Sequence, residues 1–380
     1  MMKAANRLDT VQEYYFSKKL REVRALSTEG KPIINMGIGS PDLQPPANVI
    51  KAIQQAVVIE GAHKYQSYQG LPEFREAVSD FYKNKYNVEV SSDHEILPLM
   101  GSKEGILHIS MAFLNKGDKV LIPNPGYPTY TSVTNLVEAN PIFYELTSEN
   151  NWEPDFEKLE KEDVSDIKMM WVNYPHMPTG AKATQALFEK LIAFGKKHQI
   201  LIINDNPYSF ILNNNPLSIL SVKGAKETAL ELNSLSKSFN MAGWRVGMLL
   251  GASSFLKEVL KVKTQMDSGM FYGIQQGAIS ALKVSSSWFS EMNEVYKNRR
   301  KLVWKIADTL GCSYDKNTTG MFVWAKTPQG VKAENMVDDL LYNKDIFIAP
   351  GFIFGSSGEG YIRFSLCVSE EKIKEALERL

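Results

Sequence analysis

Two β-type stretches, MMWVNYP (169–175) and ILIINDNPYSF (200–210), decide the fold class of this chain. The segment between them carries apolar residues on one helical face from 187 to 192, and Gly195 is typical of the end of that helix. Residues 200–203 are apolar without polar alternation, as in a strand that is covered on both faces. Apolar strands that alternate with helices predict an α/β domain with a mostly parallel sheet between helices.

The pattern changes towards the C-terminus. Residues 287–310 have the apolar spacing of one long helix, and three strand-like pieces follow it. These pieces are MFVWAK (321–326), IFIAP (346–350) and YIRFSLCV (361–368). We therefore expect a large domain over residues 46–285, and a smaller α+β domain made of 286–380 together with 1–45, which includes an N-terminal arm.

Composition and charge exclude several classes of function. The chain has 380 residues, with 43 lysines and arginines against 43 aspartates and glutamates, so its formal net charge is zero. A nucleic-acid binder that works by neutralising phosphates is therefore not expected. No apolar run reaches the ~18–20 residues that span a bilayer, and the N-terminus lacks the apolar core of an export signal. We expect a cytoplasmic enzyme without a nucleic-acid or membrane partner.

Cysteine and histidine usage agrees with this expectation. Cys312 and Cys367 are too few for a disulfide framework and are typical of free thiols in a reducing compartment. The five histidines are scattered along the chain without the spacing of metal ligands. We therefore expect no bound metal ion.

Polar residues follow the strands where a ligand is expected, because parallel α/β sheets bind ligands beyond the carboxyl ends of their strands. These residues are Asp205, Tyr208, Ser234, Ser236, Lys237 and Arg245. An acid, a phenol, a lysine and an arginine together suit an aldehyde cofactor that carries a phosphate. Pyridoxal phosphate needs a lysine amine for its Schiff base, an acid opposite its ring nitrogen and donors for its phosphate.

Two motifs carry a resemblance to a known family. SLSKSFNMAGWRVG (234–247) and DNPY (205–208) resemble the signatures of fold-type I, class I/II aminotransferases, which depend on pyridoxal 5'-phosphate. The resemblance implies that Lys237 forms the Schiff base and moves the substrate proton. It also implies that Ser234 and Arg245 hold the phosphate. Asp205 would face the pyridine nitrogen and Tyr208 the ring hydroxyl.

Three upstream segments extend the resemblance to the cofactor. MGSKEGI (100–106) resembles the turn whose backbone N–H groups, here those of Ser102 and Lys103, face the phosphate at a helix N-terminus. PNPGYPTY (123–130) resembles the segment whose aromatic residue, here Tyr127, stacks on the pyridine ring. In KYQSYQGLPEFREA (64–77), Tyr65 would cross a dimer interface to the phosphate of the partner subunit.

Two further segments resemble the parts of the family that hold the substrate. GYIRFSL (360–366) contains Arg363, which would take the α-carboxylate of the substrate in a bidentate pair. GIGSPD (37–42) contains Gly39, whose backbone would lie at the same carboxylate.

One position departs from the family pattern. NYPHMPTG (173–180) has Met177 where the family carries an asparagine that donates hydrogen bonds to the cofactor hydroxyl and the substrate carboxylate. A thioether donates no hydrogen bond and accepts only weakly. Three readings stay open: a tolerated change in a working aminotransferase, with His176 or water filling in; a different reaction on the same scaffold; or lost catalysis.

The resemblance implies a homodimer with shared active sites that moves an amino group from an L-amino acid to a 2-oxo acid by a ping-pong mechanism. The alternatives are a β-lyase (C–S lyase) on the same fold and a non-catalytic aminotransferase-like protein. DSGMFYGIQ (267–275) is similar in texture to aspartate and LL-diaminopimelate aminotransferases, but no second arginine for a distal carboxylate can be assigned. The aromatic residues at 14–16 either close the site or pack in the core.

Overall fold

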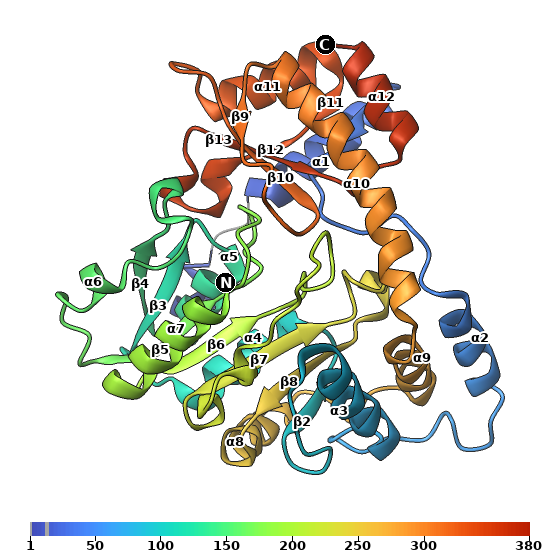
Figure 1. The fold of residues 1–380 in the computed structure, drawn as a ribbon, viewed down its shortest axis with the longest axis vertical. Coiled ribbons are helices and arrows are strands. Elements are labelled where there is room, and N and C mark those ends of the chain that lie inside the picture. Colours follow the sequence, from blue (N-terminus) through green and yellow to red (C-terminus); the bar gives the residue numbers. More distant parts are fainter. Residues whose placement is uncertain (1, 12–14) are drawn as a thin grey trace.

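The computed structural model describes residues 2–11 and 15–380, so Tyr14 lies outside the described residues. A seven-stranded sheet forms the larger part of the molecule (Figure 1). Its strands, in spatial order, are β2 (Ile96–Leu99), β8 (Gly247–Gly251), β7 (Ala229–Ser234), β6 (Leu201–Asp205), β5 (Ile167–Val172), β3 (Lys119–Asn124) and β4 (Asn140–Glu145). β8 runs antiparallel to both its neighbours and the other pairs are parallel, which confirms the mostly parallel sheet.

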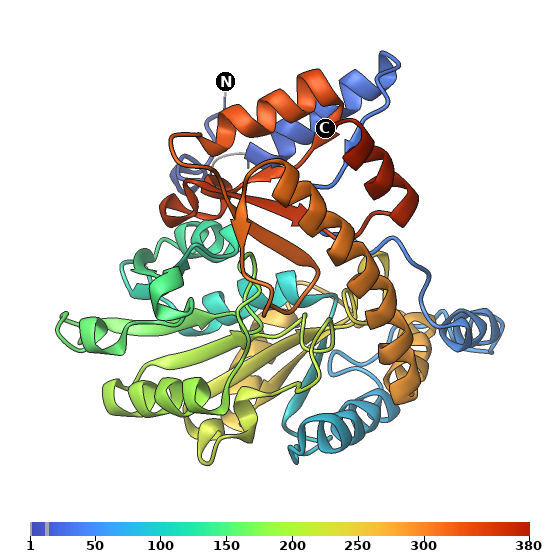
Figure 2. The ribbon, with the colours of Figure 1, turned by 45° about the horizontal axis from the view of Figure 1, so that its top comes forward.

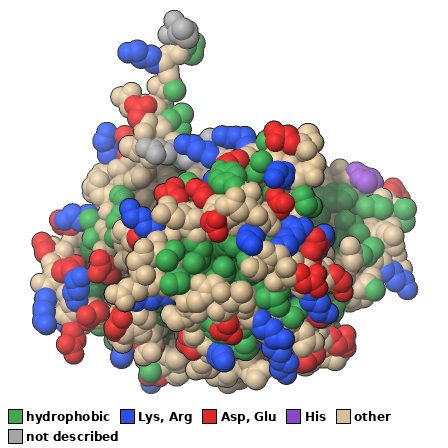
Figure 3. Space-filling view, turned by 90° about the horizontal axis from the view of Figure 1, so that it is seen from above, with side chains coloured by type: hydrophobic (Ala, Val, Ile, Leu, Met, Phe, Trp, Pro, Cys, Tyr) green, Lys and Arg blue, Asp and Glu red, His purple; other side chains and the backbone are tan. Residues whose placement is uncertain are grey.

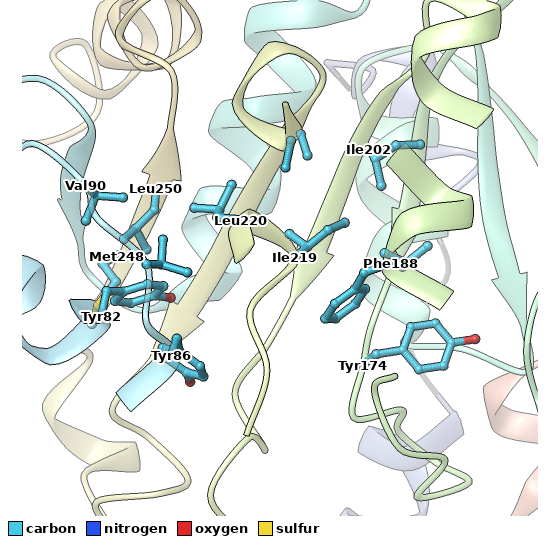
Figure 4. Packing of buried hydrophobic residues seen from close by; sticks show 14 of the residues in the cluster. Tyr82, Tyr86, Val90, Tyr174, Phe188, Ile202, Ile219, Leu220, Met248 and Leu250 are labelled. Carbon is cyan, nitrogen blue, oxygen red and sulfur yellow. The ribbon is translucent and has the colours of Figure 1, made fainter. Parts of the chain in front are cut away.

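Helices cover both faces of this sheet, because successive side chains along its strands point to opposite faces. In β6, Ile202 joins the apolar cluster to which α3 (Pro72–Tyr86), α7 (Gln185–His198) and α9 (Tyr272–Leu282) contribute. Ile203 joins the cluster on the other face, beneath α4 (Ser102–Phe113), α5 (Pro128–Leu136) and α8 (Ser253–Lys263). Figure 4 shows part of the first cluster, in which Phe188 of α7 lies near Ile202 and Ile219.

A second, smaller sheet lies above the first in Figures 1 and 2. Its antiparallel strands, in order, are β12 (Ala349–Pro350), β13 (Tyr361–Ser365), β10 (Phe322–Lys326) and β9 (Ser313–Tyr314). Next to it, β1 (Ile34–Asn35) pairs in parallel with β11 (Ile346–Phe347), so the expected strand at 346–350 is divided between two sheets. The remaining helices of this part are α1 (Tyr15–Thr28), α11 (Ala333–Lys344) and α12 (Glu370–Glu378).

The long helix expected at 287–310 is confirmed as α10 (Ser286–Thr309). Phe289, near its start, belongs to the core of the large sheet, whereas Val303 and Ile306 belong to the core of the small one. α10 therefore connects the two cores, as Figure 2 shows.

Two further α-helices are α2 (Ala47–Ala56), which packs on α9, and α6 (Phe156–Leu159). None of the helices in the described part of the chain combines the length and the apolar character that crossing a bilayer requires.

Candidate active site

A cavity of about 430 Å³ lies between the carboxyl ends of the central strands and the smaller sheet. Ten of the eleven residues that the sequence predicts for the site line it: Gly39, Ser102, Lys103, Tyr127, Asp205, Tyr208, Ser234, Lys237, Arg245 and Arg363. Met177 lines it as well. Tyr65 does not, and its side chain is 90% exposed.

Lys237 follows the end of β7 and its amine points across the cavity. Nζ donates a hydrogen bond to the carbonyl oxygen of Gly39 over 2.5 Å. Burial is the largest influence on this amine and lowers its pKa, and the charges of Arg363 and Arg245 act in the same direction. A lowered pKa increases the share of the neutral amine, which is the nucleophilic form.

Gly39 is held against the smaller sheet. A Cβ atom at this position would lie 2.7 Å from Cε1 of Phe322, so the close approach of the backbone to that ring requires glycine. The carbonyl that accepts from Lys237 is thereby fixed at the wall of the cavity.

Asp205 ends β6 at the floor of the cavity. Its Oδ2 accepts a hydrogen bond from the hydroxyl of Tyr130 over 2.9 Å. Burial raises the pKa of Asp205 to about 7, because the charged carboxylate is removed from water. Oδ1 is buried and has no hydrogen-bond partner among the described residues. A protonated ring nitrogen placed at Oδ1 would satisfy this atom and stabilise the carboxylate.

Donors that suit a phosphate converge beside the first turn of α4. Gly101 precedes Ser102 with a φ of 87°, and a Cβ there would collide with the guanidinium of Arg245. The positive end of the helix and Arg245 thus lie side by side. The hydroxyl of Ser234 accepts from the backbone N–H of Ser236 over 2.9 Å. Ser236 also lines the cavity, although its place in the sequence predicts no role for it.

The aromatic residues of the cavity frame the space for a ring. Tyr127 stands at the start of α5, with its ring edge-on to Tyr130 at 5.5 Å between centroids. Tyr208 lies edge-on to Phe322 at 5.8 Å. Burial raises the pKa of the Tyr208 hydroxyl, so this group keeps its proton and remains a hydrogen-bond donor.

Arg363 lies in β13, the strand between β12 and β10. Its guanidinium is sandwiched by two rings, with Phe322 at 4.0 Å and Phe354 at 4.5 Å from centroid to Cζ. Nη2 donates to the carbonyl of Gly37 over 2.8 Å, and Nε has no hydrogen-bond partner in the described part of the chain. Burial lowers the pKa of Arg363 to about 10. A buried cation without a carboxylate partner is a site for an anionic ligand.

Met177 contacts this guanidinium directly. Its Sδ accepts a hydrogen bond from Nη1 of Arg363 over 3.3 Å. At the position of the family's asparagine, this chain thus has only a weak acceptor. His176 does not take over that role, because its ring does not line the cavity and its Nδ1 lies 2.8 Å from Oγ1 of Thr179. Asn173 does line the cavity, but its side chain is engaged by Asp205 and by the backbone N–H of Met177.

Comparison with known proteins decides the family. The model of the family described as "Aminotransferase class I and II" matches residues 31–380. The chain belongs to this family. Among its curated relatives, the LL-diaminopimelate aminotransferase of Halothermothrix orenii is 39% identical over 100% of this chain and 98% of the relative. That of Aquifex aeolicus is 36% identical over 100% and 99%.

Solved structures agree with this assignment. Substrate-bound BacF from Bacillus subtilis superposes with a TM-score of 0.95 at 32% identity, covering 100% of this chain and 97% of that one. An aromatic aminotransferase from Pyrococcus horikoshii superposes with a TM-score of 0.87 at 30% identity, covering 94% and 97%. The chain is thus an aminotransferase of fold type I that uses pyridoxal 5'-phosphate and acts on amino acids and 2-oxo acids. This outcome favours transamination over the lyase and the non-catalytic alternatives.

A second polar cluster of the aminotransferase lies behind the first turns of α4. Ligand atoms of Glu104, His108 and Asp267 lie within 4.8 Å of one another. The ammonium of Lys263 is already there, 2.8 Å from a carboxylate oxygen of Asp267, and it also donates to the carbonyl of Tyr68 over 2.9 Å. Because this lysine supplies the positive charge, the cluster is a buried ion pair beneath the cofactor turn.

Proposed function

We propose that this aminotransferase transfers the amino group of an L-amino acid to a 2-oxo acid with Lys237 as its base. The observation that carries the proposal is the presence, in one cavity, of a buried amine at Lys237 and the buried guanidinium of Arg363, whose Nε has no hydrogen-bond partner among the described residues. One group suits the α-amino end of the substrate and the other its α-carboxylate. When bound, pyridoxal phosphate supplies the aldehyde that links to an amine and the electron-withdrawing ring.

Lys237 would hold the cofactor through its aldehyde in the resting enzyme, and the amine of the substrate would take its place. The freed Nζ remains in the cavity as a base of lowered pKa, which suits it to take the α-proton and return it to the adjacent carbon. The hydrogen bond to Gly39 supports this role, because that carbonyl orients the amine.

Asp205 and Tyr208 hold the ring. The unpaired Oδ1 of Asp205 would accept a hydrogen bond from the protonated ring nitrogen, and Tyr208 would donate one to the ring oxygen. Tyr127 would cover one face of the ring. Ser102, Lys103, Ser234 and Arg245, which line the cavity, would hold the phosphate.

Arg363 orients the substrate as well as binding it. A carboxylate held by both guanidinium nitrogens has a defined plane, and the α-carbon next to it then presents its hydrogen towards Lys237. Gly39 lies at the same end of the cavity. We read Met177 as a tolerated change, because its sulfur leaves Arg363 in place and the guanidinium unpaired by any acid.

We propose that the enzyme is a homodimer whose subunits share their active sites. A patch of exposed apolar side chains surrounds the loop of Tyr65; it comprises Val57, Val58, Ile59, Tyr65, Tyr68, Met266 and Phe271. Two contacts connect the parts of this patch: the ring of His63 stacks on Phe271 at 6.0 Å between centroids, and Lys263 donates a hydrogen bond to the carbonyl of Tyr68. Contiguous exposed apolar surface is typical of an interface. Tyr65 would then reach the phosphate of the partner subunit.

We further propose a cytoplasmic enzyme of amino-acid biosynthesis, divided into a cofactor domain of residues 46–285 and a smaller domain of 286–380 with 1–45. The name of the curated relatives supports the biosynthetic setting. Two buried free cysteines, Cys312 and Cys367, and a surface on which both signs of charge are mixed (Figure 3) suit a reducing compartment without nucleic-acid partners.

A spectroscopic titration of the holoenzyme tests the proposal. An L-amino acid should convert the yellow cofactor band to a pyridoxamine-type band, and a 2-oxo acid should restore it. Arg363→Gln should keep the yellow band but raise the required amino-acid concentration by about 100-fold, since a charged hydrogen-bond pair is lost. Arg24→Gln, which changes an exposed arginine on α1, is the control. Release of pyruvate without the second band would support the lyase instead.

A further inference from the structure

Each charged residue among the described residues that line the cavity already has a role in the proposed function. Among the described residues, those that line it are Lys103, Asp205, Lys237, Arg245 and Arg363. Lys103 and Arg245 lie at the phosphate, Asp205 at the ring nitrogen, Lys237 at the reacting carbon and Arg363 at the α-carboxylate. None of these residues of the same subunit remains for a charge at the far end of a substrate side chain.

The wall next to Arg363 is apolar instead. Phe16 and Tyr15, in the first turn of α1, line the cavity together with Ile353 and Phe354. Phe16, Tyr127 and Ile353 are partly buried and pack against the core of the smaller sheet. An uncharged side chain placed here would exchange water for hydrocarbon and aromatic surface, which is favourable.

Ring contacts hold this wall in position. Tyr15 lies edge-on to Phe352 at 5.2 Å between centroids, and Phe16 packs on Phe347 at 5.9 Å. Lys19 lies one turn further along α1, but its ammonium is paired with Asp338 at 2.9 Å and with Glu22 at 3.0 Å. This cation is therefore committed to the acids of α11 and α1, and it does not line the cavity.

We infer that the preferred amino acid of this enzyme has an uncharged apolar or aromatic side chain. A distal carboxylate, or the second amino-acid head of diaminopimelate, would lose its hydration against this wall, and no described residue of the same subunit lines the cavity with a charge left to pair with it. The specificity thus differs from the one that the relatives' name states. The inference rests on the proposed role of Arg363, which sets where the side chain begins.

Unreactive carboxylates test this inference on the holoenzyme without turnover. Calorimetric titration should give a dissociation constant for 3-phenylpropionate that is about 100-fold lower than that for glutarate, because a buried carboxylate without a partner is strongly disfavoured. The half-reaction, followed by cofactor absorbance, should be faster with L-phenylalanine or L-leucine than with L-glutamate or LL-diaminopimelate. Equal or tighter binding of glutarate, or faster conversion by LL-diaminopimelate, would overturn the inference.

A charge placed in the wall gives a second test. Ile353→Arg should tighten glutarate binding by about tenfold and weaken that of 3-phenylpropionate, whereas Val331→Arg, on an exposed loop outside the cavity, should change neither. Unchanged glutarate binding in a folded Ile353→Arg enzyme would contradict the inference that this wall contacts the side chain of the substrate.

Arg363→Gln separates this inference from the proposed function. If Arg363 holds the α-carboxylate, this variant loses affinity for both ligands. Loss of both, combined with a wild-type preference for glutarate, overturns the specificity alone. If the variant binds both ligands as the wild type does, the anchor is wrong and the specificity inference falls with it.

Discussion

Tyr130 donates its hydroxyl hydrogen to Oδ2 of Asp205 over 2.9 Å, while Oδ1 of the same carboxylate has no hydrogen-bond partner among the described residues. The tyrosine comes from the first turn of α5 and the aspartate from the end of β6. This hydrogen bond fixes the plane of the carboxylate and favours its charged form, against the burial that raises its pKa. Asp205 is thus oriented before the cofactor arrives.

Without the cofactor, the stability of the protein should depend on pH, because burial disfavours the charged form of Asp205. Because the pKa of Asp205 is about 7 in the folded protein and 3.8 ordinarily, the folded state binds this proton more tightly. The associated stability is complete below about pH 4 and is lost as the pH rises through 7. Asp205→Asn apoprotein should therefore melt about 5 °C above wild-type apoprotein at pH 8 and at nearly the same temperature at pH 4.

The holoenzyme supplies the control for this experiment. If the ring nitrogen bonds to Oδ1 as proposed, wild-type Asp205 keeps its charge, and Asp205→Asn should lower the melting temperature of the loaded protein. A melting difference between the two apoproteins that does not change with pH would contradict the raised pKa.

Lys263→Met should destabilise the enzyme strongly. The side chains of Lys263 and Asp267 are only 3% and 4% exposed, so removal of the ammonium leaves a buried carboxylate without its counter-ion. We expect a loss of about 3–5 kcal/mol and a melting temperature lower by roughly 10 °C. Lys261→Met removes an exposed ion pair with Glu258 from the same helix and should have almost no effect. Similar melting curves for the two variants would refute the structural role of this pair.

Met177→Asn should change the titration of the bound cofactor. The amide restores a hydrogen-bond donor beside the ring oxygen, which stabilises its anionic form. The pH at which the visible band of the free holoenzyme titrates should fall by about one unit. Met177→Leu removes the sulfur without adding a donor and should titrate as the wild type does. Identical midpoints for all three proteins would show that residue 177 has no influence on the ring oxygen.

Shared active sites predict that two defective variants rescue each other. Lys237→Ala lacks the reacting amine, and Tyr65→Ala lacks the aromatic residue proposed to reach the partner subunit. Each should be poorly active at limiting cofactor. After subunit exchange of an equal mixture, activity should return to on the order of one quarter of the wild-type value, because half of the dimers carry one intact site. Sedimentation should give a dimer, and a monomer in solution would rule out the arrangement.

The sequence predicted those site residues whose position follows from their neighbours in the chain. Lys237 and Asp205 follow apolar strands, and the long helix ends within one residue of the expected position. Tyr130 was missed because nothing in its own segment indicates contact with Asp205, and chain folding alone brings α5 to β6. The aromatic sandwich around Arg363 was missed for the same reason, since Phe322 and Phe354 come from separate elements. Tyr65 and the domain boundaries stay predictions.

The position of β13 near the end of the chain has a consequence for how the enzyme is made. Every residue proposed to hold the cofactor, from Tyr65 to Arg245, leaves the ribosome before Arg363 does. Arg363 is the last component of the site to be synthesised. On the growing chain, the groups that capture the cofactor therefore precede the group that recognises the amino acid.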